Sequence, residues 1–168
     1  VTGDHETGGM SMGFSGTGYA LYMERLANQT MSVEKFDAEV AAMLRKNPDL
    51  AFDGMKPLIE TAFGFRFGGG KDPMALSEAE LKEIRAAFDH DKAFHKAQIE
   101  ENKKYDGEKR YLLGNACRIA ISHKSGIGWS SSHHTAMPVM TTAKGCGEEM
   151  FSGFIENTDI AKKLKSIL

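Results

Sequence analysis

Two pairs of adjacent side chains in this sequence could bind a metal ion. Asp4 and His5 lie near the N-terminus, and His133 and His134 lie in the run WSSSHHTAMPV. Carboxylate and imidazole groups are both good zinc ligands. Taken alone each pair is weak, because a polar turn explains the first and an exposed histidine pair explains the second.

Both pairs lie at the ends of expected strands, and this makes them more suggestive together. The first follows an expected strand end at residues 1–2, and the second precedes an expected strand in residues 136–145. Folds of the α/β class place their ligands at strand ends. Catalytic zinc normally takes at least three protein ligands. One carboxylate and two imidazoles could serve one ion, or be shared between two, and the spacing leaves both open.

The remaining histidines are poorer candidates for a metal site. His90 and His95 lie among charged residues of one expected helix, so we expect them on the solvated surface. His123 lies near a helix C-terminus, where the helix dipole favours a cation. Glu6 could accept a hydrogen bond behind the metal ligands or point to water.

Bulk composition excludes some classes of function. The chain has 168 residues, of which 41% are hydrophobic, enough for one folded domain. The net charge of -2 gives no electrostatic case for a nucleic-acid partner. No apolar run approaches the roughly 20 residues of a membrane span. Cys117 and Cys146 could form a disulfide or remain separate thiols, and two cysteines do not decide it.

The elements that must position these residues can be read from local signals. Residues 3–18 are glycine-rich and predict a loop, and 19–22 could be a strand or a helix start. Ser32 predicts the cap of a helix that ends at Pro48, and Asp53 the cap of a second that ends at Gly64.

Two further helices are expected in the middle of the chain. A capping box of Ser77 and Glu80, with Leu76 stapled onto Leu81, predicts a helix to about residue 104 with a solvated, charged tail. After a break at 106–107, a helix is expected over about 108–124, ended by the glycines at 126 and 128. The residues expected to face inward in these two helices are Leu81, Ile84, Phe88, Leu112, Leu113, Ala116, Ile119 and Ala120.

The C-terminus predicts one more helix. Asn157 or Thr158 is its expected cap, and Ile160, Leu164 and Ile167 are expected to face inward. The order of strand, several helices, strand and helix suits part of an α/β sandwich, because two strands cannot bury a sheet by themselves.

Three segments of this sequence resemble the alkaline phosphatase family. TGDHETGG, at residues 2–9, is similar to the family's TADHETGG segment. GIGWSSSHHTAMPV, at 126–139, resembles its GWTSxxHTGxPV segment, and 147–164 resembles its closing strand-to-helix stretch. The resemblance implies an α/β fold: a partial three-layer sandwich, helix-rich and with an incomplete sheet. It implies that residues 1–168 are a C-terminal part of that domain, with about 19–105 as a variable, crown-like helical insertion.

The resemblance also implies roles for individual residues. Asp4 and His5 match ligands of the second zinc, and His134 matches a ligand of the first, with His133 only a neighbour. In the family, a serine attacks phosphorus and the resulting phosphoserine is hydrolysed at two zinc ions, which stabilise the entering and leaving oxygens. Gly3 in place of the usual alanine is a minor departure.

Other parts of the family's site have no match in this sequence. The nucleophilic serine, the phosphate-binding arginine, the magnesium ligands and the remaining zinc ligands lie upstream of DHETGG in the family. The chain opens on VTGDHETGG without an initiator methionine, so we expect it to be cut from a longer protein. We therefore expect this piece to be inactive alone and its parent to be a phosphomonoesterase.

The resemblance implies partners and a location as well. The expected partners are phosphate monoesters and the rest of the parent polypeptide, and a homodimer is left open. The expected location is periplasmic or extracellular. Two alternatives remain: a related metallohydrolase such as a sulfatase or phosphodiesterase, and a non-catalytic α/β binding module.

Overall fold

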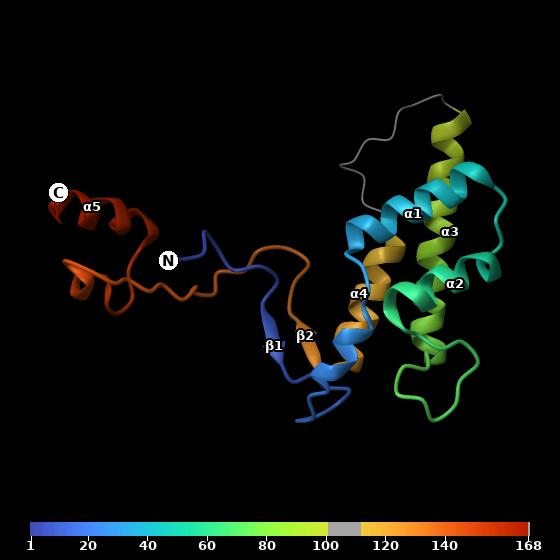
Figure 1. Ribbon diagram of the computed structural model, residues 1–168, viewed down its shortest axis with the longest axis horizontal. Helices are drawn as coiled ribbons and strands as arrows, with labels where there is room; N and C mark the ends of the chain where they lie inside the picture. Colours follow the sequence, from blue (N-terminus) through green and yellow to red (C-terminus); the bar gives the residue numbers. More distant parts are fainter. Residues whose placement is uncertain (101–111, 168) are drawn as a thin grey trace. The chain divides into compact units, whose positions relative to one another are not determined.

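The computed structural model describes residues 1–100 and 112–167 (Figure 1). The chain divides into two compact units. The terminal unit combines Val1–Ser11 with Trp129–Leu168, and the helical unit is Met12–Gly128. No helix in the described ranges is both long and apolar enough to cross a bilayer.

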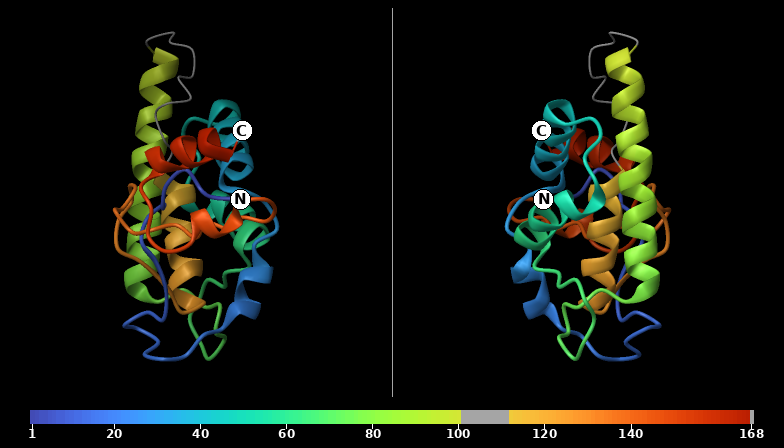
Figure 2. Two further views of the ribbon diagram at one scale, coloured as in Figure 1. Left: turned by 90° about the vertical axis from the view of Figure 1, so that its left-hand side faces the viewer. Right: turned by 90° about the vertical axis from the view of Figure 1, so that its right-hand side faces the viewer.

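Four helices build the helical unit. They are α1 (Val33–Lys46), α2 (Phe52–Phe63), α3 (Glu78–Glu100) and α4 (Leu112–Lys124), preceded by a short 3-10 helix, η1 (Met23–Asn28). Helix α4 packs against the other three, and Figure 2 shows the long α3 running alongside it. The side chains fully buried between them include Phe36, Leu44, Met55, Ile59, Phe63, Ile84, Phe88, Leu113 and Ile121.

Local signals position the ends of three of these helices as expected. The Ser32 hydroxyl accepts the Lys35 N–H at 3.2 Å and caps α1. At the start of α3, the Glu80 N–H donates to Ser77 Oγ at 3.2 Å, and the Ser77 N–H donates to Glu80 Oε2 at 2.8 Å. This reciprocal pair is the predicted capping box. Gly64 ends α2 with a left-handed φ of 70°.

Other local expectations about the helices were wrong. Ala51, not Asp53, is the N-cap of α2, and Asp53 instead pairs with Lys56 at 2.7 Å within the first turn. Leu112 is exposed instead of facing inward, because it is the first residue of α4 and turns toward solvent. The break expected at 106–107 and the helix start expected at about 108 lie outside the described residues.

The C-terminal half of α3 is only in part the solvated tail that its charges predict, because residues 96, 97 and 99 are exposed but two residues before them are buried. Asp91 is fully buried there, and its two carboxylate oxygens accept the N–H groups of Leu112 and Leu113, each at 2.9 Å. His95 is buried as well, whereas His90 is exposed as expected. The first N–H groups of α4 have no partner within their own helix, so a carboxylate from α3 satisfies them.

A second carboxylate, Asp37 of α1, lies at the same end of α4. Burial raises its pKa to about 7, and the nearby charges of Asp91 and Glu34 add to the rise. The approach is close, because a Cβ placed on Gly114 would lie 2.3 Å from Asp37 Oδ1. Glycine at 114 therefore lets α1 and α4 come together at this point.

The terminal unit holds little regular structure. Strands β1 (Met10–Met12) and β2 (Ile127–Trp129) form a two-stranded sheet, and the boundary between the two units passes through both strands. Neither strand was predicted, since β1 lies within the expected glycine-rich loop. Their pairing joins segments more than one hundred residues apart, and neither segment shows a local strand pattern.

The two strands that were predicted, at residues 1–2 and 136–145, do not form. Their segments are extended, and Val1 and Thr142 exchange two backbone hydrogen bonds of 2.6 and 2.8 Å. A strand requires a ladder of successive bonds, and one bonded pair is not enough. The helix-rich fold with an incomplete sheet is confirmed, and a three-layer sandwich stays a prediction.

The chain ends in the short 3-10 helix η2 (Glu148–Phe151) and helix α5 (Asn157–Ile167). Helix α5 begins at Asn157, so the two residues expected as its cap, Asn157 and Thr158, are instead its first helical residues. Its apolar residues were expected to face inward, but Leu164 is half exposed and no residue of α5 is buried. Ile160 and Ile167 are partly buried, so this apolar face is only partly covered.

We predict that the substitution D37N stabilises the protein at alkaline pH. The folded pKa of Asp37 is about 7, and the ordinary value is 3.8. The free energy of unfolding therefore falls as the pH rises from about 4 to about 7, because the folded carboxyl must then ionise in a poorly solvated place. We expect D37N to match the wild type near pH 4 and to exceed it by about 2 kcal/mol at pH 8, roughly half the full linkage value because the side chain is partly exposed.

Urea unfolding followed by circular dichroism at both pH values measures the difference. Asp89 is an exposed carboxylate on α3, so D89N is the matched control and should leave the pH dependence unchanged. The prediction would be contradicted if the free energies of unfolding of D37N and wild type differed by the same amount at both pH values.

Candidate metal centre

Asp4 and His5 form a preorganised pair of donors in the terminal unit. The Nδ1 atom of His5 lies 3.0 Å from the backbone carbonyl oxygen of Glu6, which can only accept. With its proton on Nδ1, a neutral His5 ring would present the lone pair of Nε2 to a metal ion. That Nε2 atom lies 3.3 Å from Asp4 Oδ2. Two donors of a tetrahedral zinc ion, each about 2.0–2.1 Å from the metal, lie about 3.3–3.4 Å apart, so this pair fits zinc in donor type and in spacing.

His134 comes to the same place from the far end of the chain. Its ring centroid lies 3.6 Å from that of His5, with the two planes tilted by 47°. The structure thus brings His5 and His134 into contact, with Asp4 beside His5. His133 is exposed, and its backbone N–H donates to Ser131 Oγ at 3.0 Å.

The number of donors is smaller than a zinc site needs. Within residues 1–100 and 112–167, no group of three or more histidine, cysteine, aspartate or glutamate side chains is arranged to hold a metal ion. The residues present therefore fit zinc in kind and in the spacing of one pair, and further ligands are needed to complete a site.

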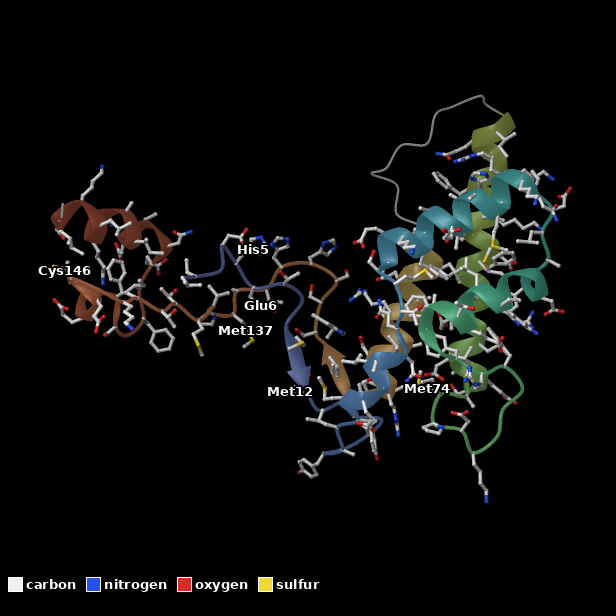
Figure 3. The ribbon with its side chains drawn as sticks, in the orientation of Figure 1. His5, Glu6, Met12, Met74, Met137 and Cys146 are labelled. Carbon is white, nitrogen blue, oxygen red and sulfur yellow. The ribbon has the colours of Figure 1, made fainter. Side chains whose placement is uncertain are left out.

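A cavity adjoins the Asp4–His5 pair. It has a volume of about 560 Å³, and Asp4, His5 and Glu6 line its polar part. Met137 and Phe154 belong to its apolar lining, and His134 is not part of the wall. Figure 3 shows His5 and Glu6 on the N-terminal segment and Met137 on the segment that follows the histidine pair.

Glu6 connects the two segments that carry the candidate ligands. Its Oε1 atom accepts the Gly9 N–H at 2.7 Å, and its Oε2 atom accepts the hydroxyl of Thr135. The Thr135 hydroxyl is the largest cause of a lowered pKa of Glu6, and the Gly9 amide lowers it further. The sequence left open whether Glu6 binds behind the ligands or points to water, and the structure gives it protein partners on both segments.

Glycines 8 and 9 let these segments approach closely. The Gly8 carbonyl accepts the N–H groups of Ser130 and Ser131 at 3.1 and 3.2 Å. A Cβ placed on Gly8 would lie 2.8 Å from the ring of Trp129, and Gly8 has a φ of +86° that other residues rarely adopt. The two glycines that close DHETGG therefore serve the contact between the segments.

The other histidines and the two cysteines do not contribute donors to this candidate centre in the part of the chain that the structure describes. Burial lowers the pKa of His123, and its ring stacks on Phe14 at 3.9 Å, so it packs as a neutral ring and not as the expected cation. His95 was expected on the surface and is buried, because α3 packs against its neighbours there. Cys117 is buried and Cys146 exposed, and both are free thiols.

Comparisons with known proteins place these features in a family. The sequence model of the family described as alkaline phosphatase matches residues 1–168. The chain is 26% identical over 164 residues to alkaline phosphatase 3 of Bacillus subtilis (strain 168), covering 98% of this chain and 28% of that protein. It is 25% identical over 171 residues to alkaline phosphatase 4 of the same organism, covering 100% of this chain and 29% of that protein.

A solved structure shares the fold. The crystal structure of a cold-active alkaline phosphatase from a psychrophilic Shewanella species matches with a TM-score of 0.60 at 23% identity. The match covers 99% of this chain and 33% of that one. The chain therefore spans about three tenths of the length of the curated relatives it matches.

We predict that G8A destabilises the terminal unit more than G153A does. Gly153 has a φ of +79° and no atom within 4 Å of the place where a Cβ would lie, so G153A carries only the backbone cost of about 1–2 kcal/mol. At Gly8 the methyl group would also displace Trp129 and the Ser131 carbonyl, which adds about 1–3 kcal/mol. Trp129 is the single tryptophan, so its fluorescence during urea unfolding reports both variants. Equal losses in the two variants would contradict the close approach.

Proposed function

The chain belongs to the alkaline phosphatase family, and from that premise we propose that it supplies part of a two-zinc site for hydrolysing phosphate monoesters. One observation carries the proposal. The ring centroids of His5 and His134 lie 3.6 Å apart although they come from opposite ends of the chain, and Asp4 Oδ2 lies 3.3 Å from His5 Nε2. Such convergence is not expected of ordinary loop residues in a binding module.

Each residue has a distinct part in holding the metal. Asp4 Oδ2 and His5 Nε2 would bind one zinc ion, and His134 would bind the other. The Glu6 carbonyl, by accepting the proton of His5 Nδ1, keeps Nε2 available as a ligand. When bound, the two ions supply Lewis-acid stabilisation of the entering and leaving oxygens of the phosphoryl group.

Charge explains how bound cations would help this site accept a substrate. Asp4 and Glu6 both line the polar part of the cavity, and their carboxylates give it negative charge. A phosphate monoester carries negative charge itself and would be repelled. Cations held by Asp4, His5 and His134 would offset this negative charge and let the site accept a phosphate monoester.

The rest of the parent polypeptide would complete the site. Three donors shared between two zinc ions are fewer than catalytic zinc normally takes. The remaining zinc ligands, the magnesium ligands and the nucleophilic serine would come from there. We therefore propose that this 168-residue piece is inactive by itself.

The surface of the terminal unit supports such a partner. Val1, Met140 and Phe154 are between 86% and 99% exposed, and Met137 is 60% exposed. Large apolar side chains gathered in one unit are usually covered by protein. We propose that the parent polypeptide covers these side chains. From the family, we further propose that residues of about 19–105 form the crown-like insertion. The same relationship suggests our third proposal, that the protein works in the periplasm or outside the cell. A homodimer remains open.

We predict that H134A and H133A differ clearly in zinc affinity and in kcat/KM in the full-length protein. H134A should lower zinc affinity and kcat/KM for a phosphate monoester by more than the roughly 10–100-fold that loss of a residue behind the ligands costs. H133A is the matched control, because both histidines are exposed but it is the ring of His134 that meets His5, and it should stay within about two-fold of wild type. Metal analysis after dialysis and steady-state kinetics measure the two effects.

The same experiment should also test which class of substrate the protein hydrolyses. Sulfate monoesters and phosphate diesters, assayed beside phosphate monoesters, test the related metallohydrolases. A preference for either would overturn the phosphomonoesterase proposal, and a metal-free wild-type protein would favour a binding module. Turnover by the 168-residue piece alone would contradict its proposed incompleteness.

A further inference from the structure

We propose that Glu6 is a positioning residue whose carboxylate holds Thr135 and thereby fixes the ring of His134 against that of His5. Its consequence for zinc rests on the proposed function, whereas the positioning itself concerns only the geometry of the protein. The residue is not a metal ligand in this proposal. Both of its carboxylate oxygens already accept hydrogen bonds from the protein.

The two oxygens of Glu6 divide their work between the two segments. Oε1 accepts the Gly9 N–H at 2.7 Å, which anchors the side chain on its own segment. Oε2 then accepts the Thr135 hydroxyl, from 129 positions away in the sequence. A hydrogen bond to an ionised carboxylate is stronger and more directional than one between neutral groups. The anchored carboxylate therefore fixes the position of Thr135.

The Glu6–Thr135 bond lies next to both histidines in the sequence, so it can fix the positions of their rings. Glu6 directly follows His5, and Thr135 directly follows His134. The bond thus ties together the immediate neighbours of the two rings that lie 3.6 Å apart. The bonds from Ser130 and Ser131 to the Gly8 carbonyl join the same two segments at other positions, after Glu6 in one segment and before Thr135 in the other. Those bonds can keep the segments associated when Glu6 is removed, but they act at a distance from the His134 ring.

The Glu6–Thr135 bond also accounts for the second glycine of DHETGG, Gly9. Gly9 must present its N–H to Glu6 while its backbone takes a φ of +59°. A Cβ there would lie 1.9 Å from Ser130 Oγ and 3.3 Å from the methyl group of Thr135. Glycine at this position leaves room for the anchored carboxylate and for the segment it holds.

The positioning can be tested without metal or activity. In the full-length protein, stripped of metal by chelation and labelled at histidine, nuclear Overhauser contacts between the His5 and His134 rings report their separation. We expect wild type and T135S to show the contact, because serine keeps the hydroxyl. E6A and T135V should lose it or weaken it several-fold.

E148A is the matched control for loss of a carboxylate. Glu148 Oε2 also accepts a backbone N–H three positions away, from Gly145 at 2.8 Å, but it makes no bond to the segment of His5. This variant should keep the ring contact. Urea unfolding of each metal-free variant identifies any that fails to fold, and if E6A does so, the comparison of T135V with T135S decides the question from the other side of the bond.

Metal binding gives the second readout. Zinc affinity by competition with a chelator should fall about 10–100-fold in E6A and in T135V. The double variant should lose no more than either single one, because both remove the same bond. The absorption spectrum of the cobalt(II)-substituted protein should change in these variants and stay as in wild type in T135S and E148A.

The outcomes separate this inference from the proposed function. A ring contact that persists in folded E6A, or additive losses in the double variant, would overturn the positioning role even if the wild type binds zinc. Loss of the contact in E6A and T135V with retention in T135S and E148A would support it. If the wild type then bound no zinc, the proposed function would fail while the positioning of His134 by Glu6 would stand.

Discussion

The candidate centre depends on one long-range contact, the meeting of the DHETGG segment with the segment of the histidine pair. Backbone bonds from Ser130 and Ser131 to Gly8 bring the two segments together, and the anchored carboxylate of Glu6 holds Thr135. Neither segment has a regular element of more than three residues to support it. The donors are therefore positioned by hydrogen bonds and by the absence of side chains at two glycines, and not by a packed core.

The helical unit follows the opposite principle. Its four helices bury a continuous set of aromatic and aliphatic side chains, which gives most of its stabilisation. An unfavourable contribution lies at the N-terminus of α4, where Asp91 is buried and accepts backbone N–H groups. Burial, and then the charge of Asp91, raises the pKa of Asp37 beside it. A neutral acid is easier to bury than a charged one, so this end of the unit favours acidic conditions.

The two units thus differ in what they need from other protein. The core of the helical unit is covered by its own helices. The terminal unit exposes Met140, Phe154 and Leu164 of α5, and it carries donors that fit zinc in kind but not in number. Both features agree with our proposal that other parts of a longer protein complete the site, since the chain spans about three tenths of the length of its curated relatives. Incomplete apolar burial and an incomplete set of ligands are what one part of a larger domain would show.

The sequence by itself determined several features that depend on residues within about four positions of each other, although not every local cap. The caps at Ser32 and at Ser77–Glu80, the stop at Gly64 and the metal-binding residue types of DHETGG all follow from local chemistry. The tertiary structure alone decided the pairing of β1 with β2, the failure of the strand expected at 136–145, the burial of Asp91 and the bond from Glu6 to Thr135. Each of these is set by a partner twenty or more residues away, and a local pattern carries no information about which distant group will supply the missing donor or acceptor.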